Sequence, residues 1–210
     1  MKTKYHIEIT QNALKGQFSS QALDDIVQAN IKQDRIKNQF GHDYIHFDGS
    51  AFAQGFSYID EQYKIILISI DKNDFMQART ALGRLCHSWQ DFYSHSNYVK
   101  LWLEKFNAQN PKEVVPDDQQ IMQHPDLKSG KNYGIIEFIA MLPILSSLIT
   151  PRMPADSHAR MNLDSPKAGN LFQFAYWASL KRTQIEYDHL MEKLQALQID
   201  PAKIQSFTGF

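Results

Sequence analysis

Two histidines and an aspartate recur every four residues in an otherwise apolar and aromatic stretch, "LGRLCHSWQDFYSHSNYV" at 82–99. Because an α-helix turns by about 100° per residue, His87, Asp91 and His95 would lie within about 80° of one helix face. His87 and His95 are then about 12 Å apart along the axis, too far to hold one ion together. Asp91 lies between them, and a carboxylate there can bridge two ions. A metal site on this face therefore requires ligands from elsewhere in the chain.

Further candidate ligands occur in the N-terminal part of the chain, at His6, at Asp34 and in "GHDYIHFD" at 41–48, which contains His46 and Asp48. Histidine and aspartate are suitable ligands for zinc. The structural alternative is that a buried histidine only hydrogen-bonds a carboxylate, with no ion present. Four other histidines are interpreted as loop or surface residues: His42, His124, His158 and His189.

The composition predicts an ordinary globular protein, and the length favours one domain over residues 1–210. The chain is 43% hydrophobic and 21% charged, and 22 basic against 23 acidic residues give a net charge of −1. This balance excludes a general electrostatic attraction to nucleic acid. An anionic substrate would have to be attracted by a local site.

Hydrophobic spacing is helical nearly throughout, so the predicted fold class is all-α, a single-domain helical bundle. A long helix is expected from a cap at Asp71 or Asn73 to about Lys105, through the stretch that carries the histidines. A final long helix is expected at about 170–196. The remaining helices are expected at 7–15, 20–34, 51–70 and 134–150, and loops at 38–50, 106–131 and 150–169.

Two segments bear on location. The first ten residues, "MKTKYHIEIT", lack the apolar core of a signal peptide, which predicts a cytoplasmic protein or one exported without a cleaved signal. The most apolar segment, "YGIIEFIAMLPILSSLIT" at 133–150, is short for a membrane span and contains Glu137 and Pro143. A buried helix is the favoured interpretation, and a membrane-touching hairpin is the alternative.

The run "HSWQDFYSHSNYV" at 87–99 resembles the signature of the heterokaryon-incompatibility (Het-C) family. The segments "HIEIT" at 6–10, "ALDDIVQANIKQD" at 22–34 and "HFD" at 46–48 resemble that family's opening blocks, and "MNLDSP" at 161–166 resembles a later block. The Het-C family is in turn similar to zinc-dependent phospholipases C and zinc nucleases, which are all-helical enzymes with a three-zinc cluster.

This resemblance implies a set of zinc ligands: His6, Asp34, His46, His87, Asp91 and His95. One ion would use Asp34, His46, His87 and Asp91, and Asp91 would bridge to a second ion that uses His6. A third ion near His95 lacks its usual ligand pair, because Asn170 and Phe174 stand there, and it would need His158, Asp156 or Asp164 instead. One or two zinc ions are therefore expected.

The implied function is zinc-dependent hydrolysis of a phosphodiester or phospholipid substrate, of the phospholipase C type. Asp34 would also act as general base, and Asp48 would orient His46 or its loop from the second shell. The alternative is a non-catalytic helical toxin component or a module that binds a partner or a membrane. A nuclease is disfavoured because the chain offers no basic patch. The oligomeric state is left open.

Overall fold

The computed structural model covers residues 1–210 and describes all of them except 36–37, 39–40, 135, 137–138 and 140–145. The described residues form helices and connecting segments, with isolated β-bridges and no strand, so the predicted all-α class is confirmed. The helices are α1 (Thr3–Leu14), α2 (Ser20–Ile31), α4 (Asp43–His46), α5 (Phe52–Asp71), α6 (Phe75–His95), α7 (Tyr98–Phe106), α8 (Gln119–Met122), α10 (Ser146–Ile149), α11 (His158–Met161), α12 (Leu171–Ala196) and α13 (Pro201–Thr208).

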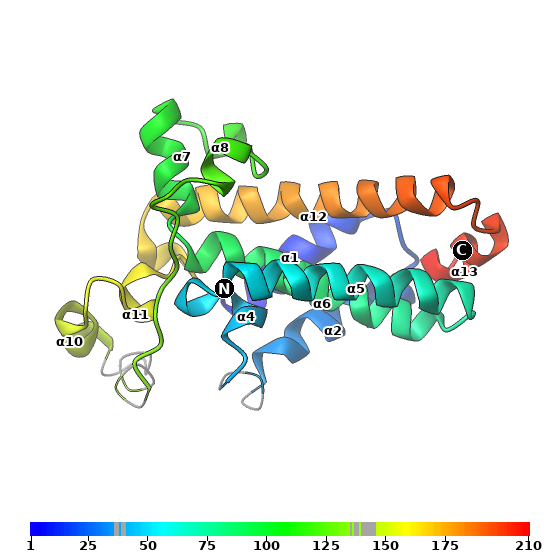
Figure 1. Ribbon diagram of the computed structural model, residues 1–210, viewed down its shortest axis with the longest axis horizontal. Helices are drawn as coiled ribbons and strands as arrows, with labels where there is room; N and C mark the ends of the chain where they lie inside the picture. Colours follow the sequence, from blue (N-terminus) through cyan, green and yellow to red (C-terminus); the bar gives the residue numbers. More distant parts are fainter. Residues whose placement is uncertain (36–37, 39–40, 135, 137–138, 140–145) are drawn as a thin grey trace.

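Helix α6 is the central element, and α2, α5 and α12 pack around it. Figure 1 shows α5, α6 and α12 running along the long axis of the molecule, with α7, α8, α10 and α11 at one end and α13 at the other. Every side chain from Leu85 to His95 is buried. Polar and apolar residues alternate around this part of α6 because it has no solvent-exposed face.

The predicted helix to about Lys105 is instead two helices. Asp74 caps α6 by accepting a hydrogen bond from the Gln77 amide at 3.1 Å, and the helix ends at His95 because Ser96 is extended. The amide of Asn97 donates to the Lys128 carbonyl at 2.9 Å, and the Tyr98 amide donates to Ser96 Oγ at 3.2 Å. These partners replace the helical hydrogen bonds, so the chain turns directly after His95.

Other departures are shorter helices in segments expected to be loops. Helix α4 and a 3₁₀ turn at Asp48–Ser50 lie in the expected loop 38–50, and α11 lies in the expected loop 150–169. Helix α13 follows the predicted final helix. The predicted apolar helix 134–150 falls largely outside the described residues. No helix among the described residues is long and apolar enough to cross a membrane.

A glycine fixes how closely α2 approaches α6. A Cβ atom at Gly83 would lie 2.3 Å from the Ile26 carbonyl oxygen, 2.7 Å from the Ala29 Cβ and 2.9 Å from the Asn30 amide nitrogen. Two of these atoms belong to backbone, which cannot rotate away. Because Asn30 contacts His87 of α6, this close approach also sets the position of one of the predicted ligands.

We expect Gly83→Ala to destabilise the fold by about 1–3 kcal/mol, because the added methyl forces the two helix backbones apart. For a domain of this size the melting temperature should fall by roughly 2–12 °C. Met76→Ala, on the exposed start of the same helix, is the control and should change stability by less than about 0.5 kcal/mol. Equal melting temperatures for Gly83→Ala and wild type in thermal denaturation would contradict the tight α2–α6 contact.

Candidate metal centre

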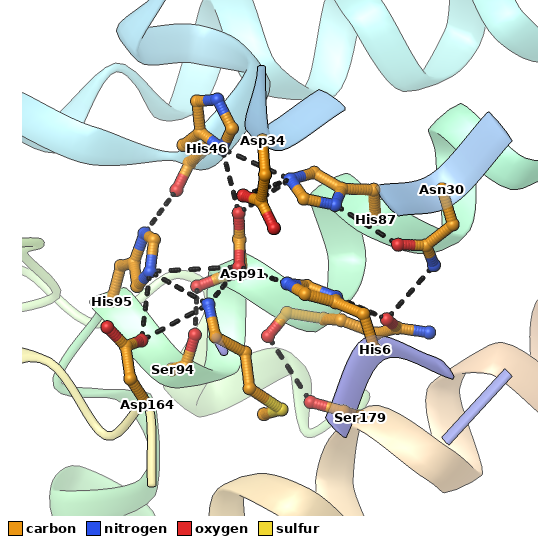
Figure 2. A network of polar contacts seen from close by, with 12 residues as sticks. His6, Asn30, Asp34, His46, His87, Asp91, Ser94, His95, Asp164 and Ser179 are labelled. Atoms are coloured by element: carbon orange, nitrogen blue, oxygen red, sulfur yellow. Dashed lines mark hydrogen bonds and ion pairs between the residues drawn. The ribbon is translucent and has the colours of Figure 1, made fainter. Parts of the chain in front are cut away.

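The six predicted ligands gather around one buried carboxylate, that of Asp91 in α6 (Figure 2). His87 and His95 come from the same helix, one turn before and one turn after Asp91. The other three come from separate elements: His6 from α1, Asp34 from the 3₁₀ turn Lys32–Asp34 that follows α2, and His46 from α4. The structure thus brings together residues that are far apart in the sequence.

The Oδ2 atom of Asp91 faces His46 and His87. It lies 2.8 Å from His46 Nδ1 and 2.9 Å from His87 Nε2, and these two nitrogens are 3.1 Å apart. Asp34 Oδ1 lies 3.7 Å from His87 Nε2. In tetrahedral zinc sites with bonds of 2.0–2.1 Å, ligand atoms are about 3.3 Å apart. The spacings between the Asp91, His46 and His87 atoms are therefore close to those of a metal site, and Asp34 Oδ1 lies slightly farther from His87.

The Oδ1 atom of Asp91 faces a different group. His6 Nε2 lies at 3.2 Å and His95 Nε2 at 3.7 Å from Oδ1. His95 Nε2 is also 3.2 Å from Asp164 Oδ1, and the amino group of Met1 lies 2.5 Å from Asp91 Oδ1 and 3.1 Å from Asp164 Oδ1. The two oxygens of one carboxylate thus serve two separate groups of side chains.

Neutral amide side chains orient two of the histidines. His87 Nδ1 lies 3.1 Å from Asn30 Oδ1, and His6 Nδ1 lies 2.6 Å from Gln90 Oε1. The amide nitrogens of Asn30 and Gln90 donate to Thr10 Oγ1, which identifies their oxygens as the atoms that face the histidines. Both Nδ1 atoms are therefore donors, and both Nε2 atoms face Asp91.

Asp48 lies beside the centre but does not contact His46 as the sequence interpretation supposed. Its Oδ1 accepts from His158 Nδ1 at 2.8 Å and lies 3.2 Å from His95 Nδ1. His95 Nδ1 also donates to the His46 carbonyl oxygen at 3.0 Å. Asp48 and the carbonyl group together hold the His95 ring with Nε2 toward Asp164 and Asp91.

Burial and charge set the protonation states. Burial lowers the pKa of His87 to about 4, although Asp91 opposes the shift, so this imidazole is neutral at pH 7. The pKa of Asp91 lies well below its ordinary value, because the Met1 ammonium and the neighbouring histidines outweigh burial. Burial alone would lower the pKa of His95, yet Asp91 and Asp48 raise it well above 6.5. Asp164 and Asp91 likewise raise the pKa of the Met1 ammonium to about 11 against burial.

Two residues at the centre were not among the six predicted ligands, and the surface position predicted for one of them was wrong. His158 is 7% exposed, not a surface residue, because it packs against His95 with ring centroids 4.4 Å apart. Asp164 follows it in "MNLDSP" and reaches the centre because the Leu163 amide donates to the Ser94 carbonyl at 2.6 Å. The one sequence signal for Asp164 was that "MNLDSP" follows the other matching segments in order along the chain. Hydrophobic periodicity indicates neither His158 nor Asp164 as a buried residue.

The two residues at the expected third-ion pair, and the remaining substitute for them, lie elsewhere. Phe174 is buried against Trp102, with ring centroids 6.3 Å apart, and Asn170 is exposed at the start of α12. Asp156 is partly exposed and pairs with Lys131 at 3.0 Å. None of these three residues contributes to the cluster around Asp91.

The cluster has the chemistry of a site for divalent cations. Its ligand-type atoms are imidazole nitrogens and carboxylate oxygens, the donors that zinc and similar ions prefer. The ligand atoms of His6, Asp34, His87 and Asp91 all lie within 4.8 Å of one another, as do those of Asp48, His95 and His158. His6 Nε2 and His46 Nε2 are buried, and neither has a hydrogen-bond partner among the residues that the structure describes.

Comparison with known proteins corrects the family assignment made from the sequence. The model of the VWA7 N-terminal domain matches residues 4–126. The von Willebrand factor A domain-containing protein 7 of Rattus norvegicus, of Mus musculus and of Homo sapiens are each 34% identical to the chain over 80 residues, which are 38% of this chain and 9% of the relative. No solved structure matches.

The predicted membership in the Het-C family, with its similarity to zinc-dependent phospholipases C, was therefore wrong. The zinc-hydrolase and toxin labels inherited from that resemblance lose their support with it. A His-x-x-x-Asp-x-x-x-His run is a property of one helix face and does not by itself identify a family. The chain spans about 9% of the length of the curated relatives that it matches. It belongs to the VWA7 N-terminal domain family.

Proposed function

We propose that this domain binds a divalent transition-metal ion between Asp34, His46, His87 and Asp91, and uses it to hydrolyse a phosphodiester. The observation that carries the proposal is the contact between His87 and Asp91. The neutral His87 imidazole turns its Nε2 lone pair toward Asp91 Oδ2 at 2.9 Å, and both atoms are buried. Two electron-rich atoms so close together in a low-dielectric interior repel each other unless a cation lies between them. The metal-binding part of the proposal rests on this geometry and not on the Het-C resemblance, and hydrolysis is the use of the ion that the assay below tests.

Zinc is the proposed ion because two imidazoles and two carboxylates are typical zinc ligands. Asn30 supports this choice, because metal-bound histidines usually donate their second ring N–H to a nearby acceptor. A bound zinc ion would supply Lewis acidity and lower the pKa of a coordinated water molecule toward neutrality.

Asp34 is proposed to have the catalytic role. Its side chain is 26% exposed, whereas those of His87 and Asp91 are fully buried and that of His46 is 4% exposed. A substrate can therefore reach the ion from the Asp34 side. The Asp34 carboxylate is placed to accept a proton from the attacking water while it contacts the same site as His87.

An open groove is connected to the Asp34 segment by one hydrogen bond. It has a volume of about 510 Å³ and is lined by Tyr44, Ala53, Gln54, Ser57, Tyr58 and Glu61. The Tyr58 hydroxyl donates to Gln33 Oε1 at 3.3 Å, and Gln33 directly precedes Asp34. Hydroxyl groups and tyrosine rings suit a polar organic group attached to a phosphodiester. Among the described residues, no basic side chain belongs to the lining of the groove. The ion would then supply the positive charge that attracts the phosphate.

The competing function is a purely structural metal site in a module that binds a partner. Its support is the depth of the centre, because five of the six predicted ligands are no more than 6% exposed. A structural site stabilises the domain without turnover. The measurements below separate the two functions.

We expect zinc to raise the melting temperature of the chelator-treated protein. At a free zinc concentration 100 times the dissociation constant, the gain is about 2.7 kcal/mol. This corresponds to roughly 5–10 °C for a domain of this size. For each variant, the melting temperature with zinc is compared with that of the same variant without metal. The isosteric variant Asp91→Asn should show little of the increase. Asp60→Asn, at an exposed position of α5, is the control and should show the full increase. A wild-type protein unaffected by zinc would contradict metal binding.

Hydrolysis is tested with bis(p-nitrophenyl) phosphate and with a chromogenic phosphocholine ester on the zinc-loaded protein. We expect turnover by wild type and by Asp60→Asn, and a loss of about 100-fold or more in kcat for Asp34→Asn, because a general base contributes about that much. Preference between the two substrates separates a general phosphodiesterase from an enzyme that acts on phospholipid headgroups. If zinc stabilises the protein but neither ester is hydrolysed, the proposed phosphodiesterase activity is wrong and the structural metal site remains.

We expect the metal-free protein to be most stable near pH 6.5. His87 has a folded-state pKa of about 4, so the unfolded state binds more protons between pH 4 and 6.5 and stability falls as the pH falls through that range. His95 has a folded-state pKa raised well above 6.5, so stability falls as the pH rises above 6.5. Thermal denaturation in a chelator from pH 4 to 9 measures this profile.

The control for this profile is His124→Gln, because His124 lies outside the centre and its side chain is 36% exposed. That variant should keep the wild-type curve, whereas His87→Gln should flatten the acidic limb. Stability that rises without a maximum from pH 5 to 9 would contradict the assigned protonation states.

A further inference from the structure

The second face of Asp91 contains a group of ligand atoms that the proposed zinc ion does not use. His6 Nε2 faces Asp91 Oδ1 at 3.2 Å and is buried without a hydrogen-bond partner. Its Nδ1 donates to Gln90 Oε1 at 2.6 Å, so the Nε2 lone pair is directed at the carboxylate. As at His87, an imidazole Nε2 atom faces a carboxylate oxygen at short range.

His95 and Asp164 complete this group. His95 Nδ1 donates to the His46 carbonyl oxygen at 3.0 Å, and this leaves Nε2 3.2 Å from Asp164 Oδ1 and 3.7 Å from Asp91 Oδ1. The Asp48–His158 pair lies behind His95 and supports its ring orientation through Asp48 Oδ1, 3.2 Å from Nδ1. Because His95 Nδ1 faces a carbonyl oxygen, it carries a proton, so the group Asp48, His95 and His158 orients His95 and does not hold an ion of its own.

A positive charge already occupies the middle of this group. The Met1 ammonium is 2.5 Å from Asp91 Oδ1, 3.1 Å from Asp164 Oδ1 and 3.2 Å from His95 Nε2 (Figure 2). The position is fully buried, so only a cation held by both carboxylates is stable there. The ammonium therefore marks where the side chains favour positive charge.

We propose that His6, His95, Asp164 and Asp91 hold a second divalent transition-metal ion, with Asp91 bridging the two ions through its separate oxygens. This site rests on the proposed function because it shares Asp91 with the first ion. In this site His6 and His95 bind the same ion, whereas the sequence interpretation assigned them to different ions. Asp164 is a ligand here, which Asn170 and Phe174 cannot be. The donor set, two imidazoles and two carboxylates, takes zinc or a similar ion.

The backbone explains how Asp164 reaches this position. The Leu163 amide donates to the Ser94 carbonyl at 2.6 Å, the Lys2 amide donates to the Asp164 carbonyl at 3.2 Å, and the His158 amide donates to the Lys131 carbonyl at 2.9 Å. A Cβ atom at Gly130 would lie 2.5 Å from His158 Cα, so this glycine permits the close packing. The segment that carries His158 and Asp164 is thus fixed against the end of α6.

The test is the number of ions bound per chain, measured by elemental analysis after dialysis against zinc and by titration with Co²⁺ followed by visible absorption. The protein is the full 210-residue chain with any affinity tag placed after Phe210. We expect two ions for wild type, one for Asp164→Asn and one for Asp34→Asn, with different cobalt spectra for the two variants. Asp156→Asn is the matched control, because Asp156 pairs with Lys131 outside the centre, and it should bind two.

The outcomes separate the two proposals. The second site would be overturned, and the first left intact, by the following result. Wild type binds one ion, Asp34→Asn binds none, and Asp164→Asn binds one with unchanged affinity. No ion in wild type would overturn both. Far-ultraviolet circular dichroism of each variant shows whether it is folded, and if Asp164→Asn is not, His95→Gln replaces it with the same expected count of one.

Discussion

A carboxylate without solvent contact is the constraint around which this domain is arranged. Asp91 lies in the middle of the central helix, and its ionised form would be unstable in the interior without positive charge or hydrogen-bond donors. These partners come from α1, α4 and α6 and from the amino group of Met1. The carboxylates of Asp34 and Asp164 lie at the edge of the group around Asp91. The short helix α4 and the segment 158–164 each contribute a residue to this group, His46 and His158 respectively, as well as apolar packing at Ile45 and Leu163.

The sequence predicted the part of the site that lies on one helix. The spacing of His87, Asp91 and His95 determines their common face through helix geometry alone, and the structure has them on that face. It also indicated the all-helical class and α5, because apolar spacing is regular there. The helix end at His95 was not predictable in the same way. It depends on the Lys128 carbonyl, which is distant in the sequence and accepts the Asn97 amide.

The residues that sequence reasoning missed or misplaced all depend on tertiary contacts. His158 stands among polar residues, so local composition indicates a surface position. It is buried because Asp48 accepts its Nδ1–H and because Gly130, which has no side chain, lets its backbone pack closely. Asp164 has no periodic neighbour, and backbone hydrogen bonds to Ser94 and Lys2 place it. The error in the family assignment has a related cause. A helix that must present a histidine, an aspartate and a histidine inward produces a similar short motif in proteins of different families.

The spread of the ligands along the sequence has a consequence for how the chain is held together. The chain has one cysteine and so forms no disulfide within itself. An ion shared by His6 and Asp164 would join the first helix to a segment late in the sequence, as a covalent cross-link would. Closing a loop of more than 100 residues in this way removes conformational freedom from the denatured chain, an effect of about 5 kcal/mol when the link also persists on unfolding. A coordination bond is released on denaturation, so here the cross-link is reversible and its strength follows the supply of the ion.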